Sequence, residues 1–459
     1  MRFLARALAV LAAALLSAQP ALAQSVLRDA ETEAFFRDIA APLIAAAGLE
    51  PANVDIVLLN DSSVNAFVAG GQAIYVHSGL IEEADTAAEI QGVIAHELGH
   101  ITGGHVIRYG EGVKQATGIS LLTLLAGVGA ALAGAGDAAM GIMAAGQQAA
   151  LGKFLAFSRA QESSADLAGA SYLSKAGISG RGSLDFFGKL LNMEYRAGYN
   201  QDEEAGFYRT HPMSSDRIET LRAVYEADPA WQKPDNPDWQ RRFERVRGKL
   251  KGYILPPGRT LQAYPESDRT IPALYARAYA FHRQAHVDKA IAATDALLAA
   301  VPGDPYFLEL KGQILLESGR PAEALGPLRA ASEATRSEPL IAALLGHALI
   351  ATEDPAHFTE AEQVLRTAVA RDRYNPFAWY QLGVVYEARG DTPRARLASA
   401  EQQVMSRRYE LALRSAQAAE AGLPTGTPDW LRAQDIAMEA RALLEQQCER
   451  EREGNCKAR

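Results

Sequence analysis

The run His96-Glu97-Leu98-Gly99-His100 places three reactive side chains at a spacing that suits metal-dependent hydrolysis. On a helix, His96 and His100 lie four residues apart on one face, so both imidazoles can reach one zinc ion. Zinc lowers the pKa of a bound water molecule, and the carboxylate of Glu97 can accept its proton during attack on a peptide carbonyl. The pattern predicts a zinc-dependent endopeptidase that holds one zinc ion per chain, with Glu97 as general base.

A catalytic zinc site needs a third protein ligand, and the acidic residues Glu162 and Asp166 supply a candidate downstream. They are again four positions apart on a predicted helix. We expect Glu162 to be the ligand and Asp166 to hold a ligand imidazole by its second ring nitrogen. Taken alone, such a pair is more often a solvated helix face. If Glu162 lay apart from the two histidines, the chain would be a metal protein without peptidase activity. We assign neither His77 nor His105 to the metal.

The elements that would position these residues follow from the apolar pattern. Apolar residues recur at helical spacing over 87–102, which predicts the helix that carries the motif. Upstream, residues 54–59 are typical of a strand, and two β-prone runs flank Gly70-Gly71, which indicates a hairpin. We therefore expect a small sheet faced by the motif helix, with residues 66–68 at or near its edge. An extended substrate could add there as a further strand.

An apolar segment, residues 115–152, separates the two parts of the predicted metal site. Its first 22 residues, 115–136, carry no charge and are long enough to span a membrane, whereas the part after Asp137 is shorter. A single crossing would separate Glu162 from the two histidines, so the metal site requires either no crossing or two. We favour a soluble helical hairpin packed on the protease, and we leave peripheral contact with a membrane surface open.

The N-terminus predicts export. Arg2 and Arg6 flank the start of an apolar stretch that continues over 7–16, and Ala21-Leu22-Ala23 forms a small-residue cleavage signature. We expect a signal peptide over 1–23, cut after Ala23, and a periplasmic location in a bacterium.

The C-terminal half contains a helical repeat. Like residues recur at a separation of 34, as in Pro305 and Pro339, Gly312 and Gly346, Ala290 and Ala324, and Ala361 and Ala395. One interval, Pro339 to Pro376, lengthens to 37, and Asp354-Pro355-Ala356 would extend a turn there. This period resembles that of tetratricopeptide repeats, whose helix pairs bury their apolar faces by stacking into a solenoid. Such a solenoid implies a protein partner, and a generic helical bundle is the alternative.

Length and composition limit the classes of protein and of partner that remain. A chain of 459 residues with 48% hydrophobic and 22% charged residues is globular and long enough for two or three domains. Its net charge of −9, without a basic stripe, argues against a nucleic-acid partner.

We expect a peptidase domain over 24–255, a repeat domain over 268–420 and a helical tail over 421–459. Cys448 and Cys456 either close a small disulfide loop or remain free thiols.

The motifs together resemble the HtpX-related gluzincin peptidases. Three features carry the resemblance besides the zinc motif: Glu162-Ser163-Ser164-Ala165-Asp166, then His211-Pro212 with Arg217, and Asn65-Ala66-Phe67 before the paired glycines. The resemblance implies that Asn65, Ala66 and Phe67 belong to an edge strand that binds substrate. It also places His211 and Arg217 near the metal. His211 would stabilise the oxyanion, or occupy the fourth coordination position and hold the enzyme latent. Each also has a structural interpretation, His211 as a loop end and Arg217 as an ion pair.

The order of signal peptide, peptidase domain and repeats resembles the BepA-type family of periplasmic proteases and chaperones. We expect a mostly α protein: an α+β zincin-type metallopeptidase domain with a small sheet, followed by an all-α tetratricopeptide-repeat solenoid. The resemblance implies quality control of envelope proteins, in which misfolded or stalled outer-membrane proteins are degraded or helped to assemble. The repeats would then bind the substrate or the assembly machinery. The alternative is a chaperone or adaptor that acts mainly through its repeats while proteolysis stays latent.

Overall fold

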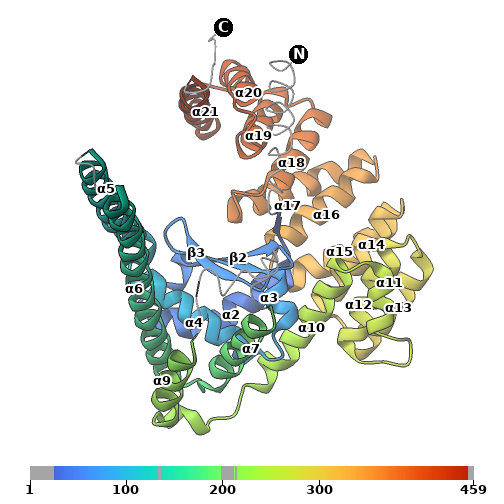
Figure 1. Cartoon of the computed structure of the whole chain (residues 1–459). Coiled ribbons are helices and arrows are strands. Elements are labelled where there is room, and N and C mark those ends of the chain that lie inside the picture. The colour runs from blue at the N-terminus through green and yellow to red at the C-terminus, as the bar shows by residue number, and fades with distance from the viewer. Residues whose placement is uncertain (1–24, 133–135, 198–210, 212–213, 453–459) are drawn as a thin grey trace, which may run out of the picture. The chain divides into compact units, whose positions relative to one another are not determined.

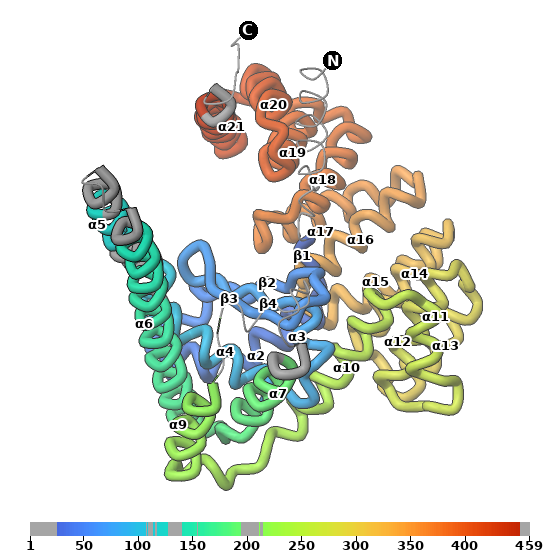
Figure 2. The backbone as a smooth tube through the Cα atoms, in the orientation of Figure 1, coloured from blue at the N-terminus to red at the C-terminus, as the bar shows by residue number. Residues whose placement is uncertain are grey.

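The computed structural model describes residues 25–132, 136–197, 211 and 214–452. These residues form two compact units. The first comprises residues 25–27 and 39–235, and the second comprises residues 28–38 and 236–452. Figure 1 labels the helices and strands, and Figure 2 traces the backbone as a tube in the same orientation.

The first unit contains a four-stranded mixed sheet in the order β1-β2-β4-β3. Its strands are β1 (Ser25–Leu27), β2 (Asp55–Asn60), β3 (Ala66–Ala69) and β4 (Ala73–His77). β2 and β4 are parallel, whereas β3 and β4 form an antiparallel hairpin around Gly70 and Gly71, both of which have positive φ. The predicted hairpin is therefore confirmed, and β3 is an edge strand of the described sheet.

Helices of the same unit carry the predicted metal-site residues except His211. They are α2 (Ala30–Ala46, the part from Ile39), α3 (Ser78–Glu83), α4 (Ala87–Thr102), α5 (His105–Leu132), α6 (Gly136–Ala176), α7 (Arg181–Ala197) and α9 (Ser215–Glu226), with the 3₁₀ turns η1 (Pro51–Asn53) and η2 (Pro229–Gln232). α4 begins after the N-cap Thr86, whose hydroxyl accepts a hydrogen bond from the Glu89 N–H at 3.1 Å. It contacts β3 and β4 as well as α6 and α7. The helix predicted over 87–102 is confirmed, and it faces the β3 side of the sheet.

The close approach of α4 and α6 depends on Gly99, inside the zinc motif. A Cβ at this position would lie 2.6 Å from the backbone oxygen of Ala165 and 2.7 Å from its Cα, which is closer than a side chain can come. A side chain at residue 99 would therefore push α6, which carries Glu162, away from α4.

α5 and α6 lie side by side as a long helical pair, as Figure 1 shows. α5 contains residues 115–132 and α6 contains residues 136–152 of the apolar segment, for which a helical hairpin was expected. Among the helices within the described ranges, none is both long enough and apolar enough to cross a membrane.

The second unit is all helical and consists mainly of consecutive helix pairs, which Figure 2 shows stacked along the chain. After α10 (Pro237–Ile254) and α11 (Pro257–Ala263), the pairs are α12 (Ile271–Arg283) with α13 (Val287–Ala300), α14 (Pro305–Glu317) with α15 (Pro321–Ala334), α16 (Pro339–Ala351) with α17 (Phe358–Arg371), α18 (Pro376–Ala388) with α19 (Thr392–Met405), and α20 (Tyr409–Gly422) with α21 (Pro428–Arg452). Pro305, Pro339 and Pro376 each begin a helix, and the turn η3 (Pro355–His357) occupies the predicted insertion. The repeat solenoid is confirmed.

The start of α2 is held in the second unit by buried and partly buried ion pairs. Lys249 of α10 pairs with Asp29, and Arg245 pairs with Glu31. The hydroxyl of Tyr275 donates a hydrogen bond to Glu31 at 2.8 Å. These contacts join residues more than two hundred positions apart in the sequence.

The units divide at residue 235, earlier than the boundary expected near residue 255. The physical reason is that α10 packs against α12 of the repeats. At the other end, α21 packs against α19 and α20, so the helix expected in a separate tail continues the solenoid. The predicted signal peptide (1–23) and Cys456 lie outside the described residues.

Candidate metal centre

Four buried side chains converge on one point in the first unit. Their ligand atoms all lie within 4.8 Å of one another, and the residues are His96, His100, Glu162 and His211. α4 supplies the two motif histidines, α6 supplies Glu162, and His211 precedes α9. The tertiary fold therefore brings together residues that the sequence separates by up to 115 positions.

The distances between these atoms fit a tetrahedral metal ion. Nε2 of His96 lies 3.1 Å from Nε2 of His100 and 3.3 Å from Nδ1 of His211. Oε2 of Glu162 lies 3.4 Å from Nε2 of His96 and 3.1 Å from Nδ1 of His211. Ligands about 2.0–2.1 Å from a tetrahedral zinc ion are about 3.3 Å apart along the edges of the tetrahedron. Imidazoles with one carboxylate are also a donor set that zinc accepts, so the residues fit a divalent metal such as zinc.

Asp166 and Arg217 support this cluster from behind. Oδ1 of Asp166 lies 2.9 Å from Nδ1 of His96, the ring nitrogen that faces away from the other ligands. The guanidinium of Arg217 donates to both carboxylate oxygens of Asp166, at 2.7 and 2.8 Å, and lies 3.2 Å from Oε2 of Glu162. All these side chains are buried. Contacts of this kind orient a ligand imidazole and select its tautomer.

Glu97 lies beside the cluster. It is fully buried, and within the described part of the chain neither of its carboxylate oxygens has a hydrogen-bond partner. Oε1 of Glu97 lies 3.6 Å from Nε2 of His211. Burial raises the pKa of Glu97, and the neighbouring His211 and His96 offset part of this shift. A buried carboxylate with a raised pKa and open lone pairs is suited to accept a proton.

The buried carboxylates create a negative potential at the cluster. Burial alone would lower the pKa of His96, but Asp166 and Glu162 outweigh it and raise that pKa to about 10. For Glu162, burial would raise the pKa, but His211 and His96 hold it well below its usual range. Burial, with His96 and His211, lowers the pKa of His100 to about 2. The site therefore favours a positive charge at its centre, which a divalent cation would satisfy.

The two histidines left unassigned by the sequence differ in position. Nδ1 of His105 lies 2.9 Å from Nδ1 of His100, so His105 contacts a ligand without joining the cluster. His77 lies elsewhere, with Nδ1 2.7 Å from the Ser63 hydroxyl. The sequence signal that could have identified His105 as a neighbour of His100 is the pair of glycines between His105 and the motif helix.

The predicted substrate strand lies next to the motif helix. Ala66 and Phe67 begin β3, and Asn65 directly precedes it. The carbonyl of Asn65 accepts a hydrogen bond from the His77 N–H at 3.0 Å, and Phe67 stacks on Tyr75 with ring centroids 5.1 Å apart. These contacts hold one edge of β3 in the sheet, while its other edge has no partner strand among the described residues.

Known proteins share this region of the chain. Residues 27–225 match the family described as Peptidase family M48. The beta-barrel assembly-enhancing protease of Escherichia coli strain K12 is 24% identical over 389 residues, covering 81% of this chain and 75% of that protein. The protein of the same name from Yersinia pestis is 24% identical over 304 residues, which cover 65% of this chain and 61% of the relative. The metalloprotease LoiP of Escherichia coli is 32% identical over 182 residues, covering 39% of this chain and 65% of the relative.

The chain thus spans less than two thirds of the length of the Yersinia pestis and LoiP relatives. The matched family region contains the complete cluster of His96, His100, Glu162 and His211, together with Arg217. By this match, residues 27–225 of the chain are similar to the peptidases of family M48.

Proposed function

We propose that this protein is an exported zinc endopeptidase of envelope protein quality control, which degrades misfolded or stalled outer-membrane proteins and assists their assembly. The observation that carries the proposal is the convergence of His96, His100 and Glu162 beside the buried carboxylate of Glu97. The family match and the printed names of the relatives support a protease.

His96, His100 and Glu162 would hold the zinc ion, one per chain. Zinc supplies a Lewis acid that activates water and polarises the peptide carbonyl. Glu97 accepts the proton of the attacking water and delivers it to the leaving amine. Asp166, fixed by Arg217, keeps the ring of His96 in the orientation that directs Nε2 toward the ligand cluster.

With His211, the cluster offers a metal ion four protein ligands. Its Nδ1 lies 3.3 Å from His96 and 3.1 Å from Glu162, at the distance of a fourth ligand. A catalytic zinc site keeps one position open for water or substrate. We therefore assign His211 the latent role: it fills the fourth position, and it must withdraw before the enzyme can act. Stabilisation of the oxyanion, the alternative role, would require the same withdrawal first.

We place the substrate at the edge of β3 that has no partner strand among the described residues. Residues 65–67 would pair with an extended chain through backbone hydrogen bonds, and such pairing tolerates many substrate sequences. Unfolded or stalled polypeptides are extended and therefore suit this mode of binding.

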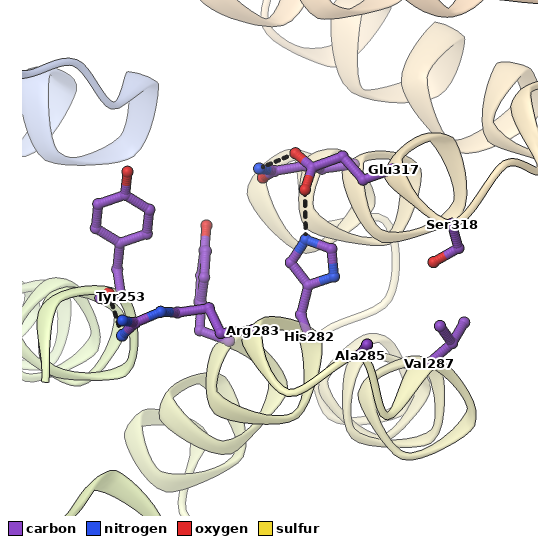
Figure 3. A pocket seen from close by; sticks show the side chains of 9 residues that line it. Tyr253, His282, Arg283, Ala285, Val287, Glu317 and Ser318 are labelled. Carbon is purple, nitrogen blue, oxygen red and sulfur yellow. Dashed lines mark hydrogen bonds and ion pairs between the residues drawn. The ribbon is translucent and has the colours of Figure 1, made fainter. Parts of the chain in front are cut away.

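The repeats would recruit the substrate or its assembly machinery, which agrees with the words "beta-barrel assembly-enhancing" in the relatives' name. An open cavity of about 450 Å³ on the repeats, shown in Figure 3, could take a side chain of such a partner. Tyr253 and Tyr279 line it with ring centroids 6.1 Å apart. Across from them, His282 lies 2.8 Å from Glu317.

The pair α5 and α6 is our candidate for peripheral contact with the membrane. Large apolar side chains are exposed along it: Leu121, Leu122, Leu124, Leu125 and Met140. Lys114 and Lys153 flank this apolar part in the sequence and could meet anionic head groups. Periplasmic location follows from the signal peptide proposed over 1–23, and the N-terminal sequence of exported protein would test the cut after Ala23.

Metal content and casein cleavage test the main proposal, with the mature wild type compared with Glu97→Gln. We expect about one zinc ion per chain in both proteins, because Glu97 is not a ligand. Wild-type cleavage that is lost in Glu97→Gln would support the peptidase. Folded wild-type protein without bound metal would contradict it.

The second candidate function is a chaperone or adaptor with latent proteolysis. The observation that favours it is the convergence of His211 with the other three residues, because four protein ligands would leave no position for water on the metal. If cells that carry only Glu97→Gln retain the cellular function, the adaptor is the better description.

A further inference from the structure

The turn after the motif helix places a third histidine against the metal site. α4 ends at Thr102, Gly103 and Gly104 follow, and α5 begins at His105. Gly104 has a φ of 62°, a left-handed conformation that glycine adopts without strain. The chain therefore changes direction within two residues, and the ring of His105 points back to His100.

The contact between the two rings is close and buried. Nδ1 of His105 lies 2.9 Å from Nδ1 of His100, and the ring planes meet at 79° with centroids 4.9 Å apart. Room for the His105 ring depends on Gly103, because a Cβ there would lie 2.4 Å from Nε2 of His105. One glycine supplies the turn and the other supplies the space.

We propose that His105 is a positioning residue whose Nδ1 accepts a hydrogen bond from the Nδ1–H of His100 and so fixes the tautomer of this ligand. A neutral imidazole has one N–H and one lone pair, so two Nδ1 atoms at this distance must be one donor and one acceptor. Nε2 of His100 faces the cluster and needs its lone pair to bind a metal ion, which leaves Nδ1 as the donor. The inference rests on the proposed zinc site and extends it.

The two motif histidines would then be held by different partners. His96 has the carboxylate of Asp166 at its outer nitrogen, whereas His100 has the imidazole of His105. Another role for His105 is direct ligation, as in the metzincin pattern, where a third histidine follows the motif and a glycine. The geometry argues against it, because His105 lies behind the ring of His100 and is not among the four converging residues.

The test compares His105→Leu, which removes the acceptor, with His105→Asn, which returns an acceptor oxygen near the position of Nδ1. His77→Leu is the matched control, because it removes another buried, hydrogen-bonded histidine of the same unit. Zinc affinity of the full mature protein would be measured by competition with a chelator at fixed pH. We expect a loss of about 10- to 100-fold in His105→Leu and no more than about threefold in His105→Asn and His77→Leu.

Folded His105→Leu that binds zinc as tightly as the wild type would overturn the inference while leaving the zinc site intact. Wild-type protein that binds no zinc would overturn both. If His105→Leu does not fold, ¹⁵N chemical shifts of the zinc-loaded wild type decide instead. Nδ1 of His100 should be protonated and hydrogen-bonded, and an unprotonated Nδ1 would refute the assignment.

Discussion

Nε2 of His211 lies 3.6 Å from Oε1 of Glu97, so the residue in the fourth ligand position also covers the proposed general base. The two nitrogens of one ring therefore face the two groups that a substrate and its attacking water would have to reach. A single side-chain movement would uncover both.

The first prediction concerns the proposed latent role of His211. His211→Ala should raise the rate of casein cleavage by about tenfold or more. In the wild type, only the minor population of molecules in which His211 has withdrawn could act, whereas in the variant the fourth coordination position would be open in every molecule. The double variant His211→Ala with Glu97→Gln is the control, and loss of the general base should lower its rate by about 10²- to 10⁴-fold. A slower His211→Ala single variant would instead favour the oxyanion role.

The second prediction concerns the buried pair of Arg217 and Asp166. Arg217→Met should destabilise the peptidase unit by about 3–5 kcal/mol, because it leaves a buried carboxylate without its cation. Urea unfolding of the full mature chain, followed by circular dichroism, measures this change. The control is Arg222→Met in the same helix, whose partner Glu226 is exposed, and its effect should stay below about 1 kcal/mol. Equal unfolding midpoints for the two variants would contradict the prediction.

The third prediction concerns pH and Glu309 of the repeats, a partly buried residue whose Oε2 atom is buried and has no hydrogen-bond partner among the described residues. Burial raises the pKa of Glu309 to about 8, although Lys249 lies nearby, and Asp29, Glu338 and Glu31 raise it further. The folded protein thus retains a proton that the unfolded chain releases above its ordinary pKa of 4.5. Stability is therefore lost as pH rises from about 4.5 to 8, at about 1.4 kcal/mol for each pKa unit of difference.

Glu309→Gln should therefore stabilise the repeats at pH 8, by an amount on the order of a few kcal/mol, and leave them nearly unchanged at pH 5. Urea unfolding at the two pH values measures the difference. Glu323→Gln, at an exposed site of the same repeats, should show no such gain at pH 8. A gain of equal size at both pH values would refute the protonation argument.

The fourth prediction concerns the exposed leucines of α5. Changing both Leu122 and Leu125 to Glu should abolish flotation of the mature protein with vesicles that contain anionic lipid, because charged side chains oppose insertion into the interface. The control is Leu411→Glu with Leu431→Glu, two exposed leucines of the repeats. If the wild-type protein floats with neither neutral nor anionic vesicles, the proposed membrane contact is refuted.

Local patterns predicted much of the candidate site. The spacing of His96 and His100, and that of Glu162 and Asp166, depends only on helix geometry, which a sequence shows directly. The hairpin around Gly70 and Gly71 could be predicted for the same reason, because a turn is encoded within a few residues.

Features that depend on tertiary packing were missed. The role of His105 follows from the left-handed conformation of Gly104 and from the space beside Gly103, neither of which helical spacing reveals. The division of the two units at residue 235 depends on such packing, because an amphipathic helix such as α10 does not show in its own sequence which helix it contacts. Its ion-pair partners, the partly buried Asp29 and the buried Glu31, lie near the opposite end of the chain.

The four converging side chains come from two helices and from the segment before a third. No short segment of the chain contains the complete set. The two helices approach closely at Gly99, and this contact requires that both have formed. An unfolded chain therefore has no zinc site and cannot cleave the proteins around it. If the protein is exported unfolded, as proposed, its proposed proteolytic activity can begin only in the compartment where it folds.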